Sequence, residues 1–135
     1  MSTDSEIALR WLPLSDFPQA ACSHWRMRSD SDFRLTVEGD FFVGVAVKTL
    51  VIEFSRVCAV AAHDDMGGKS MFGSETEIPM IGGESIARWP MLKIQNSRWL
   101  AAVCAFPEEN SHFALLSYEC TVEAIAPGEP EVHWK

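Results

Sequence analysis

Short runs in which apolar and polar residues alternate recur along much of the chain. Residues 25–28 read WRMR and residues 33–38 read FRLTVE. This period of two is typical of a strand with one face buried and the other face in water. The residues EGD at 38–40 predict a hairpin turn after the second of these strands, because Gly39 tolerates a positive φ.

Residues 47–61 are compatible with two different elements. Apolar side chains at 47, 50, 51, 54, 57, 58 and 61 would form one stripe of a helix. However, Leu50, Ile52 and Phe54 also lie two positions apart, and β-branched and aromatic side chains, which favour strands, are dense here. We favour a strand over about 50–60 and keep the helix as the alternative.

One helix is expected in the second half of the chain, over about 97–105. Asn96 or Ser97 can cap its first turn, since each offers a side-chain oxygen to free backbone N–H groups. Further strands are expected near 92–94, 112–118, 121–126 and 132–134. The pattern therefore predicts an α+β, mainly β fold, with a largely antiparallel sheet or sandwich of about six to eight strands and one short helix near 97–105.

The segment 63–90 lacks such a pattern. It holds five of the eight glycines of the chain, which predicts a long excursion with little regular structure. Its apolar side chains Met66, Met71, Phe72 and Met80 suit a binding surface that repacks against a partner. The alternative is that these side chains fold back over the sheet as a lid.

Length and charge narrow the kinds of function. The 135 residues suit a single domain, 1–135. A net charge of −8 disfavours binding to nucleic acid, which requires a basic face, and would instead steer a basic protein partner toward the chain. A homodimer formed through an unpaired edge strand is a further alternative.

The apolar runs and the cysteines bear on compartment and cofactors. No apolar run approaches the ~18 residues of a membrane span, and the residues MSTDSE are acidic where a signal peptide would be positive. The four cysteines form no CxxC pair, and Cys58 and Cys104 lie in apolar runs, where a thiol behaves as a small hydrophobic group. We therefore expect a cytoplasmic protein with reduced thiols, no membrane contact and no cofactor.

Two pairs of residues are candidates for chemistry. His63 and Asp65 share one side of an extended chain and could ligate a metal ion, but they need further ligands from elsewhere. The alternative there is an ordinary turn at the end of a strand. Glu123, if it points inward, could act as a general base with His112. Alternation in a one-sided sheet instead favours a Glu123 that faces water.

Three stretches of the second half carry a resemblance. The sequences KTLVIEFSRVCAVAAHDD, LKIQNSRWL and HFALLSYECTVEAIA, with EVHW after them, resemble a pattern in small uncharacterised bacterial proteins. In that pattern a strand leads to an acidic turn, a short S-x-W-L helix and two closing strands, the first of which opens with a histidine. Some of these proteins are similar to immunity proteins of polymorphic toxin systems. The resemblance covers about 48–134 and implies a mainly β, non-enzymatic protein.

The residues and the resemblance lead to one main hypothesis and two alternatives. The main hypothesis is a small acidic binding protein, immunity-like, with 63–90 as part of its contact surface. The first alternative is a small metal-dependent or general-base enzyme that uses His63 and Asp65 with His112 and Glu123. The second alternative is a protein that binds a small apolar ligand under the 63–90 loop.

Overall fold

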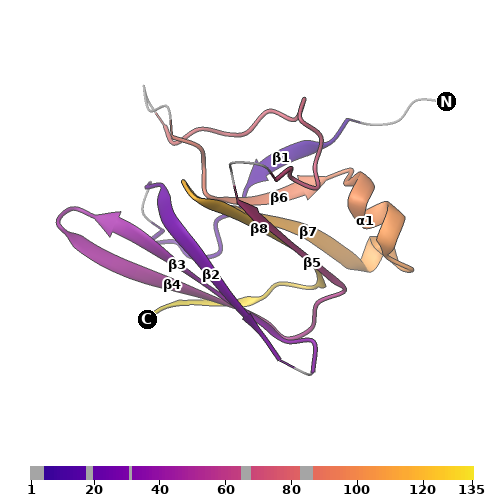
Figure 1. The fold of residues 1–135 in the computed structure, drawn as a ribbon, viewed down its shortest axis with the longest axis horizontal. Helices are drawn as coiled ribbons and strands as arrows, with labels where there is room; N and C mark the ends of the chain where they lie inside the picture. The colour runs from indigo at the N-terminus through magenta and orange to yellow at the C-terminus, as the bar shows by residue number, and fades with distance from the viewer. Residues whose placement is uncertain (1–4, 18–19, 31, 65–67, 83–86) are drawn as a thin grey trace.

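Nine strands form two antiparallel sheets, and one short helix lies beside one of them (Figure 1). This computed structural model describes residues 5–17, 20–30, 32–64, 68–82 and 87–135. The prediction of a mainly β, antiparallel fold with one short helix is confirmed. The described part of the chain contains nine strands, where six to eight were expected.

The strands are divided five and four between the sheets. The five-stranded sheet has the order β1 (Ile7–Arg10), β6 (Met91–Gln95), β7 (Asn110–Leu116), β8 (Cys120–Pro127) and β5 (Ala59–Asp64). The four-stranded sheet has the order β2 (Cys22–Ser29), β3 (Leu35–Val43), β4 (Ala46–Phe54) and β9 (Glu131–Trp134).

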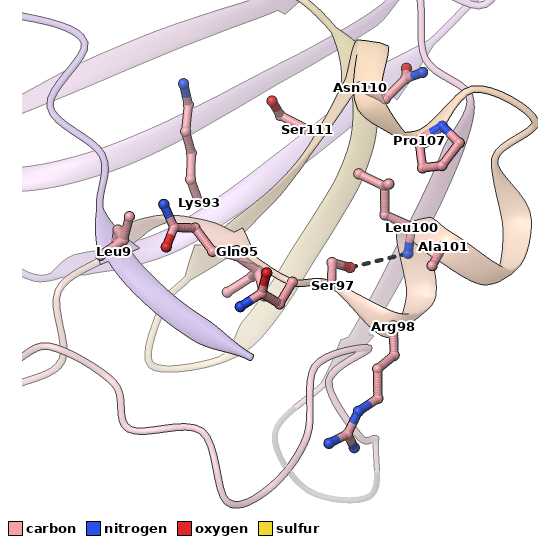
Figure 2. Close-up of a pocket in the computed structure, with 12 residues that line it drawn as sticks. Leu9, Lys93, Gln95, Ser97, Arg98, Leu100, Ala101, Pro107, Asn110 and Ser111 are labelled. Atoms are coloured by element: carbon pink, nitrogen blue, oxygen red, sulfur yellow. Dashed lines mark hydrogen bonds between the residues drawn. The ribbon is translucent and has the colours of Figure 1, made fainter. Parts of the chain in front are cut away.

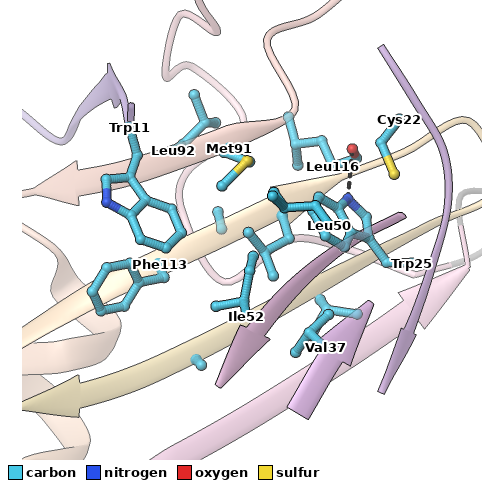
Figure 3. Packing of buried hydrophobic residues seen from close by; sticks show 14 of the residues in the cluster. Trp11, Cys22, Trp25, Val37, Leu50, Ile52, Met91, Leu92, Phe113 and Leu116 are labelled. Carbon is cyan, nitrogen blue, oxygen red and sulfur yellow. Dashed lines mark hydrogen bonds between the residues drawn. The ribbon is translucent and has the colours of Figure 1, made fainter. Parts of the chain in front are cut away.

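The core lies between the two sheets (Figure 3). The rings of Phe54 on β4 and Phe113 on β7 meet at a centroid distance of 5.3 Å. The indole Nε1 of Trp25 on β2 donates a hydrogen bond of 2.8 Å to the carbonyl of Leu116 on β7. This bond satisfies the one polar atom of a buried indole, so the large ring can fill the core at little cost.

The helix α1 (Arg98–Val103) confirms the expected helix near 97–105. Ser97 is its N-cap, and the Ser97 Oγ accepts a hydrogen bond of 3.1 Å from the backbone N–H of Leu100. Asn96, with φ 57°, turns the chain from β6 into the helix, a conformation that asparagine tolerates better than most residues. A 3-10 turn, η1 (Pro107–Glu109), then leads into β7.

The hairpin turn predicted at 38–40 is wrong, because β3 runs straight through these residues. Gly39 is needed for a different reason: a Cβ at this position would lie 2.4 Å from the ring of Trp25, which packs over it. The turn lies five residues later at Gly44 and Val45, and Gly44 has φ 65°. A positive φ at the first position of a two-residue turn matches the twist of hairpin strands.

Residues 47–61 contain strands, so the helix alternative is wrong, but a single strand over 50–60 is also incorrect. β4 ends at Phe54 in the four-stranded sheet, and β5 begins at Ala59 in the five-stranded sheet. Residues 55–58 carry the chain from one sheet to the other. The predominantly apolar stretch 46–64 therefore supplies one strand to each layer of the sandwich.

Candidate functional site

The outer face of the five-stranded sheet gathers three of the four candidates for chemistry, His63, His112 and Glu123. Residues directly opposite each other in antiparallel strands share a face. Glu123 on β8 lies opposite Ala61 on β5, so Glu123 shares its face with His63, two positions further along β5. His112 on β7 lies opposite Ile125 and belongs to the same face.

Helix α1 and residues 71–73, which we call the covering segment, cover this face. The ring of Trp99 lies 5.1 Å from the ring of His112, and the ring of Phe72 lies 6.4 Å from it. His112 and Glu123 are 1% and 0% exposed. The preference for a water-facing Glu123 is therefore wrong, since the sheet is covered on both faces at this position.

A continuous hydrogen-bond chain runs through the covered face. The Ser97 Oγ lies 2.7 Å from His112 Nδ1, and His112 Nε2 lies 2.8 Å from Glu123 Oε1. The other carboxylate oxygen of Glu123 accepts a hydrogen bond of 2.8 Å from the backbone N–H of Met71. Both nitrogens of the histidine and both oxygens of the glutamate thus have partners, as buried polar groups require.

The order serine, histidine, carboxylate is also the order of a hydrolase triad. With the proton of a neutral His112 on Nε2 and directed at Glu123, the hydroxyl of Ser97 donates to Nδ1. In hydrolases that place the serine between a strand and a helix, the N–H of the next residue binds the oxyanion.

That N–H is already used in this chain. The backbone N–H of Arg98 donates a 3.0 Å hydrogen bond to Glu6 Oε2. A carboxylate at this position would repel a developing oxyanion. The arrangement can transfer a proton between Ser97 and His112, but it is poorly suited to acyl transfer.

Two buried carboxylates instead fasten the segment after β5 to the sheet. Glu6 is 7% exposed, and its Oε1 accepts a hydrogen bond of 2.8 Å from the backbone N–H of Gly73. Glu123 accepts a hydrogen bond from the backbone N–H of Met71, which lies two residues before Gly73. Because Glu6 also binds Arg98 at the start of α1, it connects the edge strand β1, the helix and the covering segment.

The sequence did not single out Glu6 or Ser97 for this role. Ser97 was expected only as a helix cap, and its bond to His112 joins residues 15 positions apart. Glu6 reaches Gly73 and Arg98 across 67 and 92 positions. The local signal at Glu6 is a lone acidic residue before an apolar strand, which does not identify either partner.

The metal candidates are only partly described. His63 Nδ1 lies 3.0 Å from the backbone oxygen of Asp64, while Asp65 lies outside the described residues. No group of three His, Cys, Asp or Glu side chains in the described ranges is arranged to hold a metal ion. A Cβ on Gly68 would lie 2.2 Å from the Cβ of His63, so the chain passes closely over this histidine.

The predicted binding surface divides into covered and exposed parts. Phe72 is half-buried against the sheet, whereas the side chains of Met71 and Met80 are exposed. Met66 lies outside the described residues. Met80 pairs with Arg88 in an isolated bridge, and the guanidinium of Arg10 donates to the carbonyl of Met80 at 2.6 Å. Phe72 therefore folds back over the sheet, as the lid alternative expects. The side chains of Met71 and Met80 are accessible to a partner.

Two hollows border this region. A groove of about 870 Å³ runs beside α1, with Ser97 at its edge (Figure 2). A smaller cavity of about 360 Å³ lies between β1 and the segment 75–79, and its lining includes Glu6, Glu75 and Glu77. Three acidic residues in the lining are unfavourable for a purely apolar ligand.

The tip of the β3–β4 hairpin, residues 42–47, is a second unusual region. Phe42, Val43 and Val47 are 60%, 36% and 56% exposed, and Val45 is fully exposed. The hairpin projects from the body of the molecule at the left of Figure 1. The sequence FFVGVAV, which is apolar at nearly every position, carries this signal.

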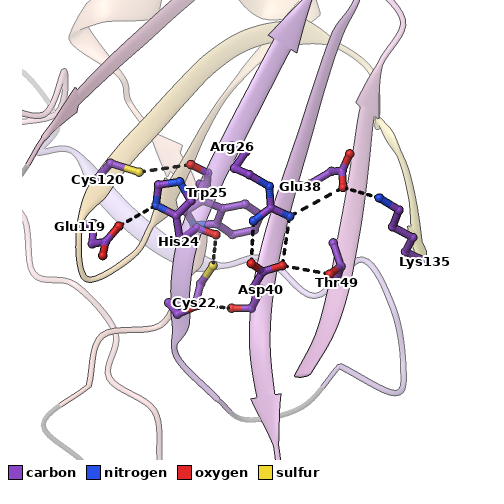
Figure 4. Close-up of polar contacts among 11 residues, drawn as sticks. Cys22, His24, Trp25, Arg26, Glu38, Asp40, Thr49, Glu119, Cys120 and Lys135 are labelled. Carbon is purple, nitrogen blue, oxygen red and sulfur yellow. Dashed lines mark hydrogen bonds and ion pairs between the residues drawn. The ribbon is translucent and has the colours of Figure 1, made fainter. Parts of the chain in front are cut away.

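A set of polar contacts holds the hairpin just below its tip (Figure 4). Arg26 on β2 bonds both oxygens of Asp40 at 2.6 and 3.1 Å, and the hydroxyl of Thr49 donates to Asp40 at 2.9 Å. The hydrogen bonds from the Arg26 guanidinium, followed by the bond from Thr49, hold the pKa of Asp40 below its ordinary value. These contacts link three neighbouring strands across the outer face of the four-stranded sheet.

No protein-family model, no curated protein and no solved structure matches this chain. Among the described helices, none is long and apolar enough to cross a membrane. The fold and its contacts are therefore the basis for assigning a function.

Proposed function

We propose that this chain is a small, acidic, cytoplasmic binding protein without enzymatic activity, and that the β3–β4 hairpin tip binds a partner protein. The observation that carries the proposal is the exposure of four large apolar side chains, at 42, 43, 45 and 47, on one projecting hairpin. Clustered apolar side chains in water are typical of interaction surfaces.

The rigidity of the hairpin supports this role. The strands stay in register up to the turn, where Val43 pairs with Ala46. The side chains of Asp40 and Thr49, each four residues from the turn, are joined by a hydrogen bond. A surface that is already ordered loses little conformational entropy on binding, so more of the contact energy appears as affinity.

The charge of the chain indicates the kind of partner. An apolar pocket that receives the tip, surrounded by basic residues, would complement a chain with a net charge of −8. This is also what the resemblance to immunity proteins implies, since such a protein must bind its toxin. A second copy of the chain is the alternative occupant of the tip.

The proposal is tested by cross-linking followed by binding measurements. A photo-reactive phenylalanine analogue at position 45 identifies the protein that contacts the tip in the native cell. The purified partner is then titrated with the wild type, with Val45→Asp and with Val103→Asp, a matched change at an exposed valine on α1. We expect Val45→Asp to weaken binding by about tenfold or more and Val103→Asp to leave it unchanged.

Three results would count against this role. Equal affinity of the wild type and Val45→Asp would remove the tip from the interface. A cross-link only to a second copy, with a dimer in sedimentation that Val45→Asp dissolves, would make the tip a self-association surface. An association rate that does not fall with added salt would contradict a basic partner.

A general-base or hydrolytic enzyme is the second candidate, which the buried His112–Glu123 hydrogen bond favours. A fluorophosphonate reagent, which labels activated serines, distinguishes it from the binding protein. Labelling of Ser97 that His112→Gln abolishes would support the enzyme. Labelling no greater than that of Ser97→Ala would reject it.

A further inference from the structure

Two cysteines distant in sequence lie side by side at the surface. Cys58 ends the segment 55–58 between the two sheets, and Cys104 is the C-cap of α1. The Cys58 Sγ donates a weak hydrogen bond to the Cys104 Sγ at 3.9 Å, across 46 positions of sequence. The backbone N–H of each also has a partner, the carbonyl of Ile125 for Cys58 and that of Leu100 for Cys104. Two anchored backbones thus hold the thiols together.

Both thiols are accessible, which corrects the expectation that these cysteines are small core residues. Cys58 is exposed and Cys104 is half-buried. Both line a surface cavity of about 540 Å³, with Arg56 and Phe106 among the other lining residues. A molecule the size of a tripeptide disulfide can therefore reach them.

Cys22 provides a contrast within the same chain. It is 1% exposed, and desolvation by burial raises the pKa of its thiol to about 12. A thiol of this kind is unreactive, because the thiolate is the nucleophile. Cys22 therefore differs sharply from Cys58 and Cys104 in its access to oxidants.

We propose that Cys58 and Cys104 form a reversible intramolecular disulfide by exchange with a small disulfide such as oxidised glutathione. The sulfur atoms must approach from 3.9 Å to about 2.05 Å, which requires a modest side-chain movement. This site is independent of the hairpin tip and of the proposed partner.

The exchange proceeds in two balanced steps. The Cys104 thiolate attacks one sulfur of oxidised glutathione, breaks its S–S bond and releases one glutathione thiolate. The Cys58 thiolate then attacks the Cys104 sulfur of the mixed disulfide and releases the second glutathione thiolate. The two protein thiols lose two electrons to the glutathione disulfide, and their two protons pass to the released thiolates.

Cys104 is assigned the first attack because its sulfur accepts the hydrogen bond from Cys58. Desolvation and this same bond also raise the pKa of the Cys58 thiol above its ordinary value. The order of attack predicts that the Cys58→Ser variant accumulates the mixed glutathione disulfide on Cys104.

The bond would constrain a defined part of the molecule. The closed loop from 58 to 104 contains β5, the covering segment, β6 and α1. Closing a loop of this length reduces the freedom of the unfolded chain. The disulfide would therefore stabilise the covering segment and the helix, which together hold the His112–Glu123 face.

The test uses the full chain with all four cysteines. The reduced protein is equilibrated with glutathione buffers of graded redox potential and analysed by intact mass and peptide mapping. We expect a loss of two hydrogen masses, a cross-linked peptide pair containing 58 and 104, and free thiols at 22 and 120. The melting temperature should rise by about 5–10 °C and return after reduction.

Single variants and a second reagent complete the experiment. Cys58→Ser and Cys104→Ser should each abolish the bond and the rise in melting temperature, whereas Cys120→Ser should change neither. Phenylarsine oxide, which bridges neighbouring thiols, should bind the wild type once and bind neither of the first two variants. Glutathione adducts that persist without ring closure in the wild type, or a cross-link to 22 or 120, would overturn the proposal.

Discussion

The covered face of the five-stranded sheet buries ionisable side chains, whereas the tip of the β3–β4 hairpin exposes apolar ones. On the covered face, the ionisable side chains of Glu6, His112 and Glu123 are buried, and each of their polar atoms that can form a hydrogen bond has a partner. At the tip, large apolar side chains stand in water.

The requirements of folding explain the covered face, but they do not explain the exposed apolar side chains of the tip. A buried carboxylate is tolerable only when its hydrogen bonds replace those it made to water, so the geometry of the covered face follows from the needs of folding. Exposed side chains at the tip contribute little to the folded state. Their apolar character is instead consistent with binding to a partner outside the chain.

The largest expected effect is at Glu123. Glu123→Ala leaves the buried Nε2 of His112 and the buried N–H of Met71 without their hydrogen-bond partners, and we expect it to lower the free energy of unfolding by about 3–5 kcal/mol. Urea unfolding followed by fluorescence measures this change. Glu123→Gln has the same shape and keeps one acceptor, so it should cost less than half as much. If the two variants were equally stable, the hydrogen bonds would not be what stabilises this face.

Glu6 should have a smaller and more local effect. Glu6→Ala removes the acceptor for the backbone N–H groups of Gly73 and Arg98, at an expected cost of about 2 kcal/mol. Hydrogen exchange should show faster exchange at these two amides and at neighbouring residues of the covering segment, with the core of β7 unchanged. Uniformly faster exchange across the chain would instead mean that Glu6 supports the whole fold.

The fold was predictable where the spacing of apolar residues in the sequence matches the spacing of buried residues in the structure. Ser97 marked the start of α1, and alternation indicated β2 and β3. It did not give their buried faces correctly, because Met27 on β2 is 45% exposed and Phe33 lies outside β3 and is 67% exposed. Alternation did not locate the end of β3, because Gly39 accommodates the ring of Trp25 rather than a turn, and that ring comes from another strand. The break between β4 and β5 was also hidden, since apolar side chains precede and follow residues 55–58 and the two strands belong to different sheets.

The candidate site was predictable in its chemistry but not in its surroundings. The sequence offered His112 and Glu123 as a pair only on the condition that Glu123 points inward, and alternation favoured the opposite orientation. Their burial depends on a cover supplied by residues 71–73, which are held by Glu6 from the other end of the chain. Such contacts join segments that are far apart in the sequence, so the spacing of residues within one segment cannot reveal them.

At the base of the hairpin, the contribution of Asp40 to stability should depend on pH. Asp40→Asn removes the charge that Arg26 and Thr49 contact, and we expect a loss of about 0.5–1 kcal/mol at pH 7, because the pair is partly exposed. The pKa of Asp40 is lower in the folded protein, so the unfolded chain takes up the proton first as pH falls.

The difference between wild type and Asp40→Asn should therefore be complete at neutral pH. It should shrink as the pH falls below about 3.9, the ordinary value of an aspartate, and disappear once the folded-state carboxyl is protonated. Urea unfolding of both proteins at a series of pH values measures it. A difference that stayed constant down to the lowest pH would contradict the ionic origin.

The smallest expected effect on stability is at the tip itself. Val45→Asp places a charge where the side chain is already fully in water, so we expect the free energy of unfolding to change by less than about 0.5 kcal/mol. Val37→Asp makes the same substitution on the same hairpin at a residue that is 0% exposed, and a buried unpaired charge there should prevent stable folding. Urea unfolding and circular dichroism compare the two. A large loss of stability in Val45→Asp would mean that the tip packs within the chain, and its apolar side chains would then need no partner to explain them.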